Sequence, residues 1–153
     1  MPGYYPVFLQ LRGRLCVVVG GGEVAQRKVE ALVEAGARVR VISPSLSPRL
    51  SQLAASGQVG AEPRPYATGA LKGAFLAIAA TDDPEANRQV VREARRRRVL
   101  LNVVDEPRAC SFIMPSVVRR GELVLAISTG GLSPALSRKV REDLEAHFGA
   151  EYA

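Results

Sequence analysis

The sequence predicts an α/β fold in which helices cover both faces of a parallel sheet. Short apolar runs alternate with longer segments of helical periodicity, which is the pattern of such a doubly wound sheet. A glycine-rich turn, Gly20–Gly22, directly follows the first apolar run and opens the first helical segment. The 153 residues are enough for one such domain with a short appendage.

The predicted elements follow from apolar runs, helical spacing and capping residues. Strands are expected over residues 14–19, 38–42, 59–62, 75–80 and 99–104. Helices are expected over residues 24–35, 47–55 and 83–97. After residue 110 the pattern changes to strands over 116–118 and 123–127, a turn over 119–121, and a helix from Ser133 to about Phe148. The prediction is therefore a domain over residues 1–110 and a smaller region over residues 111–153.

The composition excludes several classes of protein. Apolar residues make up 47% of the chain, which excludes wholesale disorder. The apolar runs are far shorter than the ~20 residues of a membrane span, and the N-terminus shows no signal peptide. Two cysteines and one histidine make neither a disulfide framework nor a zinc site. These features predict a soluble cytoplasmic protein without a metal site or a membrane contact.

The charge is strongly basic, with a net value of +6. Of the basic residues, 18 are arginine and 3 are lysine. Arginine binds carboxylates and phosphates through two parallel hydrogen bonds, so an anionic ligand or a nucleic acid is compatible with this composition. A general bias toward arginine, without any ligand, is the alternative.

The first glycine turn fits the G-x-G-x-x-G/A fingerprint of dinucleotide-binding proteins over residues 20–25. It lies between a predicted strand and a predicted helix, which is the context that the fingerprint requires. A glycine turn without a ligand is the alternative. The acid that usually follows the second strand is replaced by Ser43-Pro44-Ser45, and Arg40 is a candidate for meeting a 2′-phosphate. The choice between NAD and NADP stays open on these residues alone.

Two further loops carry candidate chemistry. Asp105 follows the strand over residues 99–104, at the sheet edge where ligands of parallel sheets bind. It is a candidate general base, and a turn-capping role is the alternative. The segment Ser128–Gly131 is a second glycine turn before a helix, where a carboxylate or phosphate can bind. Tyr4, Tyr5 and Phe8 are expected to pack on the edge of the sheet.

The order of these motifs resembles that of the precorrin-2 dehydrogenase/sirohydrochlorin ferrochelatase family of siroheme biosynthesis, a branch of porphyrin biosynthesis. The resemblance rests on segments 5–8, 19–28, 77–83, 102–105, 111–116 and 128–134. It implies a Rossmann-like NAD-binding domain and oxidation of precorrin-2 to sirohydrochlorin. Many members also insert Fe²⁺ as a substrate, and the family forms homodimers through the region after the nucleotide domain.

The resemblance also assigns roles to residues of this sequence. It makes Asp105 the catalytic residue, and it expects NAD despite the missing acid after the second strand. The cofactor-binding residues are expected to be Gly20, Gly21, Gly22, Glu23, Val24, Ser43, Pro44, Ser45, Thr81 and Asp82. The substrate-binding residues are expected to be Asn102, Ser128, Thr129, Gly130 and Gly131. The serine of the family's second glycine loop corresponds most directly to Thr129.

The chain ends at Ala153, where family members often continue with another helical segment. We therefore expect dehydrogenation more firmly than ferrochelation. One alternative is a non-catalytic NAD-sensing regulatory domain, which usually carries an acid where this chain has Ser43. A nucleic-acid-binding protein is less compatible with an aromatic content of only 5%.

Overall fold

The computed structural model describes residues 3–153, and residues 1–2, where the first predicted domain begins, lie outside the described part. The chain forms two compact units. We call residues 7–112 the sheet unit, and residues 113–153 together with 3–6 the hairpin unit. The sequence places the boundary between residues 110 and 111.

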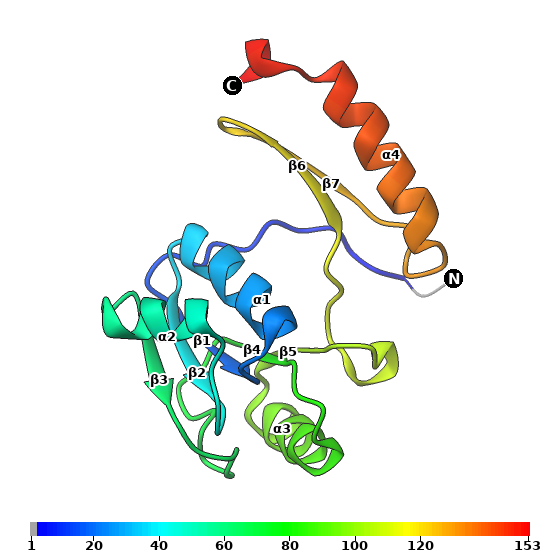
Figure 1. Cartoon of the computed structure of the whole chain (residues 1–153). Helices are drawn as coiled ribbons and strands as arrows, with labels where there is room; N and C mark the ends of the chain where they lie inside the picture. The colour runs from blue at the N-terminus through cyan, green and yellow to red at the C-terminus, as the bar shows by residue number, and fades with distance from the viewer. Residues whose placement is uncertain (1–2) are drawn as a thin grey trace. The chain divides into compact units, whose positions relative to one another are not determined.

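The sheet unit contains the predicted alternation of strands and helices (Figure 1). Its strands are β1 (Leu15–Val19), β2 (Arg38–Ile42), β3 (Val59–Glu62), β4 (Leu76–Ala79) and β5 (Leu100–Val103). Its α-helices are α1 (Glu23–Glu34), α2 (Pro48–Ala55) and α3 (Pro84–Arg97). A 3-10 turn, η1, covers Pro107–Ala109.

All five strands are parallel and lie in the order β3-β2-β1-β4-β5. The chain builds one half of the sheet outward from β1 and then returns to build the other half from β4. The predicted Rossmann-like α/β fold is confirmed. The reversal of direction falls between β1 and β4, which is where such sheets bind their ligands.

Both faces of the sheet are buried because side chains alternate along each strand. Cys16 and Val18 of β1 join the cluster that α1 and α2 cover, whereas Val17 and Val19 join the cluster that α3 covers. The same alternation places Ile78 on one side and the small Ala77 and Ala79 on the other. Figure 1 shows α1 and α2 on one side of the sheet and α3 on the other.

The helix ends follow from local capping. Ser47 accepts a hydrogen bond from the backbone N–H of Leu50 at the start of α2, and Asp83 accepts one from Glu85 at the start of α3. Pro48 and Pro84 stand at the first helical positions, where their missing N–H costs nothing. The start of α1 differs, because its N-cap is Gly22 and no side chain caps it.

The outer edge of β5 is covered by the segment that follows η1. The backbone N–H of Leu101 donates to Ser111 Oγ at 2.8 Å, and the N–H of Val103 donates to Cys110 Sγ at 3.1 Å. The N–H of Ser111 donates to the carbonyl oxygen of Leu101 at 2.8 Å. Residues 104–111 therefore form a closed excursion whose two ends are fixed to β5.

The hairpin unit consists of antiparallel strands β6 (Ser116–Arg120) and β7 (Leu123–Ile127), helix α4 (Pro134–His147) and the 3-10 turn η2 (Ala150–Tyr152). Figure 1 shows α4 running alongside the two strands. Arg120 ties the end of α4 to β6, because its guanidinium donates to the carbonyl oxygens of Phe148 (2.7 Å) and Glu145 (3.1 Å).

Two predicted details are wrong. Arg119 and Arg120 belong to β6, and the turn lies at Gly121-Glu122, because a two-residue hairpin turn with positive φ at Gly121 is enough to reverse the chain. Phe8 is 74% exposed, so its side chain does not pack on the sheet edge as expected, and Tyr4 and Tyr5 belong to the hairpin unit. In the part of the chain that the structure describes, no helix has the length and apolarity needed to span a bilayer.

Candidate functional site

The carboxyl ends of four strands bring most of the predicted site residues to one edge of the sheet. The glycine turn follows β1, Ser43 follows β2, Thr81 lies two residues after β4, and Asp105 lies two residues after β5. The central pair, β1 and β4, stays joined beyond the strands, because the N–H of Ala80 donates to the carbonyl oxygen of Val19 at 2.7 Å. The sheet edge between β1 and β4, where the order of the strands reverses, is thus built from the glycine turn and the Thr81 loop.

Two glycines of the first turn have no room for a side chain. Gly20 has φ +129, and a Cβ built on it would overlap the carbonyl oxygen of Ala80. A Cβ on Gly21 would overlap the carbonyl oxygen of Ser45 and lie 2.7 Å from Ser43 Oγ. The turn is therefore wedged between the end of β4 and the loop after β2, and the N–H of Ser47 donates to Gly21 O at 2.7 Å.

The start of α1 is open and fits a dinucleotide. A Cβ on Gly22 would meet nothing within 4 Å, so the backbone there is accessible to a ligand. The first N–H groups of a helix have no partner within the helix, and no side chain caps them here. Glu23 and Val24 are exposed on this first turn. Free N–H groups and the positive end of the helix dipole favour a pyrophosphate at this place.

The loop after β2 places a neutral residue, Ser43, beside the glycine turn. Ser43 is only 7% exposed, and its N–H donates to Glu62 O at 3.2 Å. Arg40, the predicted candidate for a 2′-phosphate, lies in the middle of β2 instead. Its guanidinium donates to the carbonyl oxygen of Ala70 at 2.5 Å and its Nε lies 3.5 Å from Glu62 Oε1. These contacts remove Arg40 from the list of candidate phosphate ligands.

The loop after β4 is fixed by its own side chains. Thr81 Oγ1 accepts from the N–H of Asp83 at 3.1 Å, and Asn87 Nδ2 donates to the carbonyl oxygen of Thr81 at 3.1 Å. Asp82 is exposed beside Thr81. Thr81 and Asp82 therefore stand in a loop that hydrogen bonds hold next to Gly20, and their contact with a nicotinamide stays a prediction.

Asp105 stands at the tip of the excursion after β5. It has φ +62, a left-handed conformation that Asp and Asn tolerate better than other residues with a side chain. The N–H of Glu106 donates to the carbonyl oxygen of Val103 at 3.2 Å and closes the turn. The side chain of Asp105 is exposed at the same sheet edge as the glycine turn, so its carboxylate is available to a ligand.

Asn102 is less accessible than its predicted role requires. It lies inside β5, is 8% exposed, and its Nδ2 donates to the carbonyl oxygen of Phe112 at 3.2 Å. This contact helps to hold the segment that closes the excursion of Asp105. A substrate contact of Asn102 stays a prediction.

The second glycine turn belongs to the hairpin unit. Thr129 Oγ1 accepts from the N–H of Ser133 at 3.0 Å and lies 3.3 Å from Ser137 Oγ, so this hydroxyl stabilises the start of α4. Ser128 is exposed, and its Oγ accepts from the N–H of Gly130 at 3.0 Å. Gly130 and Gly131 both have positive φ, but a Cβ on Gly131 would meet nothing within 4 Å.

A pocket of about 310 Å³ lies beside this turn. Its lining combines apolar side chains, hydroxyl groups and two arginines. The lining residues are Ile113, Met114, Ser116, Ile127, Ser128, Thr129, Gly131, Pro134, Ser137, Arg138 and Arg141. Arg141 is held by Glu145 at 2.6 Å, whereas Arg138 is exposed on the same helix. Such a lining suits an apolar ring that bears carboxylates.

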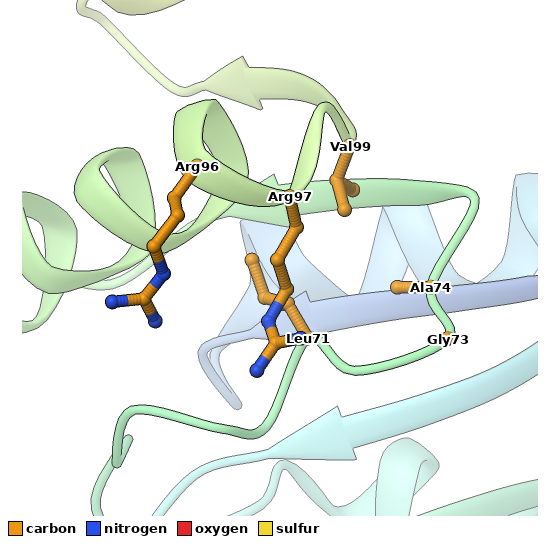
Figure 2. Close-up of a pocket in the computed structure, with 6 residues that line it drawn as sticks. All are labelled: Leu71, Gly73, Ala74, Arg96, Arg97 and Val99. Atoms are coloured by element: carbon orange, nitrogen blue, oxygen red, sulfur yellow. The ribbon is translucent and has the colours of Figure 1, made fainter.

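A hollow of the sheet unit, about 580 Å³, lies at the opposite edge of the sheet. Figure 2 shows Arg96 and Arg97 extending from the last turn of α3 beside it. Its other lining residues are Leu71, Gly73, Ala74 and Val99, which precede β4 and β5. Because these are the amino ends of the strands, this hollow is separate from the glycine turn and from Asp105.

Sequence reasoning missed a buried cluster around Glu93, which is 1% exposed. Its carboxylate accepts from Tyr66 Oη, from the N–H of Gly69 and, at 2.6 Å, from Arg97 Nε. Burial acts to raise the pKa of Glu93, but the hydrogen bonds outweigh it and the pKa lies below its usual value. Burial and the Glu93 hydrogen bond raise the pKa of Tyr66. The cluster anchors the loop before β4 and lies away from the glycine turn.

No group of three or more His, Cys, Asp or Glu side chains is placed to hold a metal among residues 3–153. Both cysteines are free, and burial in β1 raises the pKa of the Cys16 thiol to about 11. Cys110 is occupied by its contacts with β5.

Comparisons with known proteins agree with this geometry. A family model described as putative NAD(P)-binding matches residues 7–116, and one described as sirohaem biosynthesis protein central matches residues 120–147. Siroheme synthase of Methylobacillus flagellatus is 48% identical over 147 residues, which are 96% of this chain and 32% of that protein. Siroheme synthase 1 of Serratia proteamaculans is 50% identical over 143 residues, which are 94% of this chain and 30% of that protein.

The chain thus spans about a third of the length of the curated relatives that it matches. A solved structure of SirC, described as a precorrin-2 dehydrogenase, is similar with a TM-score of 0.85 and 31% sequence identity. The similarity covers 97% of this chain and 73% of that chain.

Proposed function

The chain belongs to the family of precorrin-2 dehydrogenases and siroheme synthases, and we propose that it oxidises precorrin-2 to sirohydrochlorin with NAD. One observation carries the proposal. The open start of α1, the fixed loop of Thr81 and the exposed carboxylate of Asp105 follow three adjacent strands, β1, β4 and β5, at one edge of the sheet. A dinucleotide and a proton acceptor can therefore serve one substrate.

The chain's own groups explain how the cofactor is oriented. The N–H groups at the start of α1 bind the pyrophosphate, and the wedged Gly20 and Gly21 keep the backbone close enough to do so. The bound nicotinamide supplies the acceptor for a hydride. The rigid loop of Thr81 and Asp82 orients the ring beside Gly20. Placement of this kind accounts for much of the rate of a hydride transfer.

Asp105 completes the balance of the reaction. Oxidation removes a hydride and a proton from precorrin-2, and the exposed carboxylate is placed to accept the proton. The same carboxylate is a candidate to accept a pyrrole N–H proton when Fe²⁺ enters the product. That step needs no protein metal cage, because the macrocycle supplies four nitrogen ligands.

The substrate surface is proposed to include the pocket beside Ser128 and Thr129. Precorrin-2 is an apolar macrocycle that carries eight carboxylates, which matches a pocket lined by apolar side chains and by Arg138. The net charge of +6 favours the approach of such an anion.

We also propose that a second copy of this chain covers the hairpin unit. Among its described residues only Val118 and Ser137 are buried, so nearly all of its apolar side chains remain partly or fully exposed. Leu132 and Leu136 are 78% and 53% exposed. In analytical ultracentrifugation, Leu136→Glu should give a monomer. The control Lys139→Glu, on the exposed side of the same helix, should remain a dimer, and a monomeric wild type would refute the proposal.

The central test removes the negative charge of Asp105 but keeps a side chain that tolerates the left-handed backbone conformation. Asp105→Asn tolerates the left-handed conformation, whereas Asp105→Ala adds backbone strain. The expected result is loss of NAD-dependent formation of sirohydrochlorin by about 100-fold or more, the range typical of general base catalysis, with unchanged NAD binding. Glu106→Gln, the neighbouring exposed acid, should retain activity.

Full activity in Asp105→Asn would reject the role of Asp105. An NAD-sensing domain would bind NAD in both variants and convert no precorrin-2 even as wild type. Adding Fe²⁺ to sirohydrochlorin in the same set of variants, and following the absorption spectrum, decides whether the chain also inserts iron.

A further inference from the structure

Asp105 has a backbone conformation that the rest of its excursion must maintain. Its φ of +62 lies in the left-handed region, which residues with a side chain seldom adopt. Such a conformation is strained and persists only where the surrounding structure fixes it. One fixing contact is the hydrogen bond from the N–H of Glu106 to the carbonyl oxygen of Val103, at 3.2 Å. A single bond of this kind leaves an exposed turn free to move, so further contacts at its ends matter.

The thiol of Cys110 binds backbone groups on both sides of Asp105. Its Sγ accepts a hydrogen bond from the N–H of Val103 at 3.1 Å. The same sulfur lies within donor distance of two carbonyl oxygens, that of Val103 at 3.3 Å and that of Glu106 at 3.4 Å. Because Val103 comes two residues before Asp105 and Glu106 comes directly after it, one side chain joins the two ends of the strained turn.

The neighbouring residue, Ser111, makes the same kind of contact farther from Asp105. Its Oγ accepts from the N–H of Leu101 at 2.8 Å and lies 3.3 Å from the carbonyl oxygen of Leu101. Both side chains thus satisfy backbone groups at the outer edge of β5. Of the two, only Cys110 contacts the residues that flank Asp105. The pair therefore separates support of the sheet edge from support of the turn.

The surroundings of Cys110 indicate that it acts on the reaction only through Asp105. The residue is half-buried and packs against the apolar cluster that α3 covers. Its sulfur is engaged by backbone groups, which a thiol can do as a weak donor and a weak acceptor. Cys110 is therefore not placed in the catalytic or binding machinery itself.

We propose that Cys110 is a positioning residue, which holds the carboxylate of Asp105 in the orientation that accepts the proton of the substrate. The inference rests on the role proposed above for Asp105. A displacement of about 1 Å, caused by a change away from the reacting atoms, can lower a rate by about 100-fold. Loosening of this turn should therefore appear in the kcat rather than in the binding of substrate or cofactor.

The test compares kcat and KM for NAD-dependent oxidation of precorrin-2 in variants of Cys110. Cys110→Ala removes every hydrogen bond of the thiol, so kcat should fall about tenfold, as expected for a displacement well below 1 Å. The KM for precorrin-2 and the dissociation constant of NAD⁺ should change less than about twofold, because uniform binding is untouched. Cys110→Ser keeps a donor and an acceptor and should restore kcat to within about threefold of the wild type.

A double-mutant cycle shows whether Cys110 acts through Asp105. In the Asp105→Asn background no proton acceptor is left to orient, so Cys110→Ala should lower the remaining activity less than about twofold. A tenfold loss in this background, equal to that in the wild type, would overturn the inference. If Cys110→Ala does not fold, Cys110→Val takes its place, because the backbone of Cys110 is extended and suits a β-branched side chain. An unchanged kcat in the folded variant would also overturn the inference.

Ser111→Ala is the matched control. It removes the corresponding contacts with Leu101 and should lower the melting temperature as Cys110→Ala does, but leave kcat within about twofold of the wild type. Equal losses of kcat in the two variants would mean that both residues only support the edge of β5, which contradicts the inference. A wild type that does not oxidise precorrin-2 would overturn the proposed function as well.

Discussion

The two units of the chain differ in how they bury apolar side chains. The sheet unit contains both core clusters, one on each face of the sheet, and its central strand β1 has Cys16, Val17 and Val18 at 0% exposure. The hairpin unit contains one buried apolar side chain among its described residues, Val118. A parallel sheet with helices on both faces encloses its own core, whereas a hairpin with one helix covers one face and exposes the other.

The two glycine turns differ in the same way. Gly20 and Gly21 are wedged against neighbouring backbone, so their shape depends on three strands at once. Gly131 stands in open space in the hairpin unit. The comparison indicates that the glycine turn of the sheet unit is preorganised, whereas the order of the hairpin unit depends, in our proposal, on a second copy of the chain.

Separating the units should give the largest effect. A fragment of residues 7–112 is expected to unfold cooperatively on heating, because both core clusters lie within it. A fragment of residues 113–153 is expected to lose nearly all its helical circular dichroism at low concentration, because it buries so little. A concentration-independent, cooperative transition in the smaller fragment would contradict the proposal that a partner completes it.

Alanine substitutions in the two glycine turns should give the second-largest difference. Gly21→Ala places a Cβ against the Ser45 carbonyl and should weaken NAD⁺ binding by about 100-fold, comparable to the cost of an overpacked contact of roughly 3 kcal/mol. Gly131→Ala, with φ +84 but open space, should cost only the ~1 kcal/mol of a left-handed alanine and leave NAD⁺ affinity unchanged. Calorimetry and thermal melts check both. Equal losses of NAD⁺ affinity would show that the two turns do not differ in preorganisation.

The buried Glu93 should make the stability of the sheet unit depend on pH. Its pKa in the folded protein lies below the usual 4.5, so the ionised group stabilises the fold above that pH and loses this effect as the pH falls further. Glu93→Gln should lower the free energy of unfolding at pH 7 by about 1–3 kcal/mol, because Tyr66, Gly69 and Arg97 lose a charged acceptor. The variant's stability should also fall less steeply below pH 4.5.

The matched control for Glu93 lies in the hairpin unit. Glu145 pairs with Arg141 at 2.6 Å, but its side chain is 35% exposed. Glu145→Gln should cost less than about 1 kcal/mol, as expected for an exposed pair. Urea titrations at several pH values measure both variants, and a larger loss from Glu145→Gln would reverse the interpretation.

The arginine-lined pockets should give the smallest effect. Arg138→Gln, in the pocket of the hairpin unit, should raise KM for precorrin-2 about threefold to tenfold with little change in kcat, as expected for a contact that binds substrate and transition state alike. Arg96→Gln, in the larger hollow at the far edge of the sheet, should change neither constant. An effect of Arg96→Gln without an effect of Arg138→Gln would indicate that the substrate binds in the hollow of the sheet unit.

Much of the fold could be predicted because its signals are local. The bounds of β2, α2 and β3 follow from alternating apolar residues, from Ser47-Pro48 and from Gly57, and the cap of α3 follows from Asp83-Pro84. The hairpin turn was misplaced because two arginines resemble a loop. In fact Arg120 is in β6 and binds the end of α4, a contact between residues 25 and 28 positions apart.

The site was predictable only in part. The fingerprint of residues 20–25 and the position of Asp105 after a strand are visible in the sequence. The contacts of Arg40 with Ala70 and Glu62 depend on strand pairing, which the sequence does not display. Glu93 shares the buried face of α3 with Ala86, Val90 and Ala94, so helical spacing does place it toward the core. The sequence does not display its partners, because Tyr66 and Gly69 come from a loop more than 20 positions away.

The closure of the β5 edge affects how copies of the chain can associate. Cys110 and Ser111 occupy the hydrogen-bonding groups of β5 that an added strand would need. The other outer strand, β3, is four residues long and is followed by Pro63 and Pro65, which cannot extend a ladder of hydrogen bonds. Growth of the sheet by edge-to-edge aggregation is therefore disfavoured on both sides, so the association that we propose for the hairpin unit need not extend the sheet of the other unit.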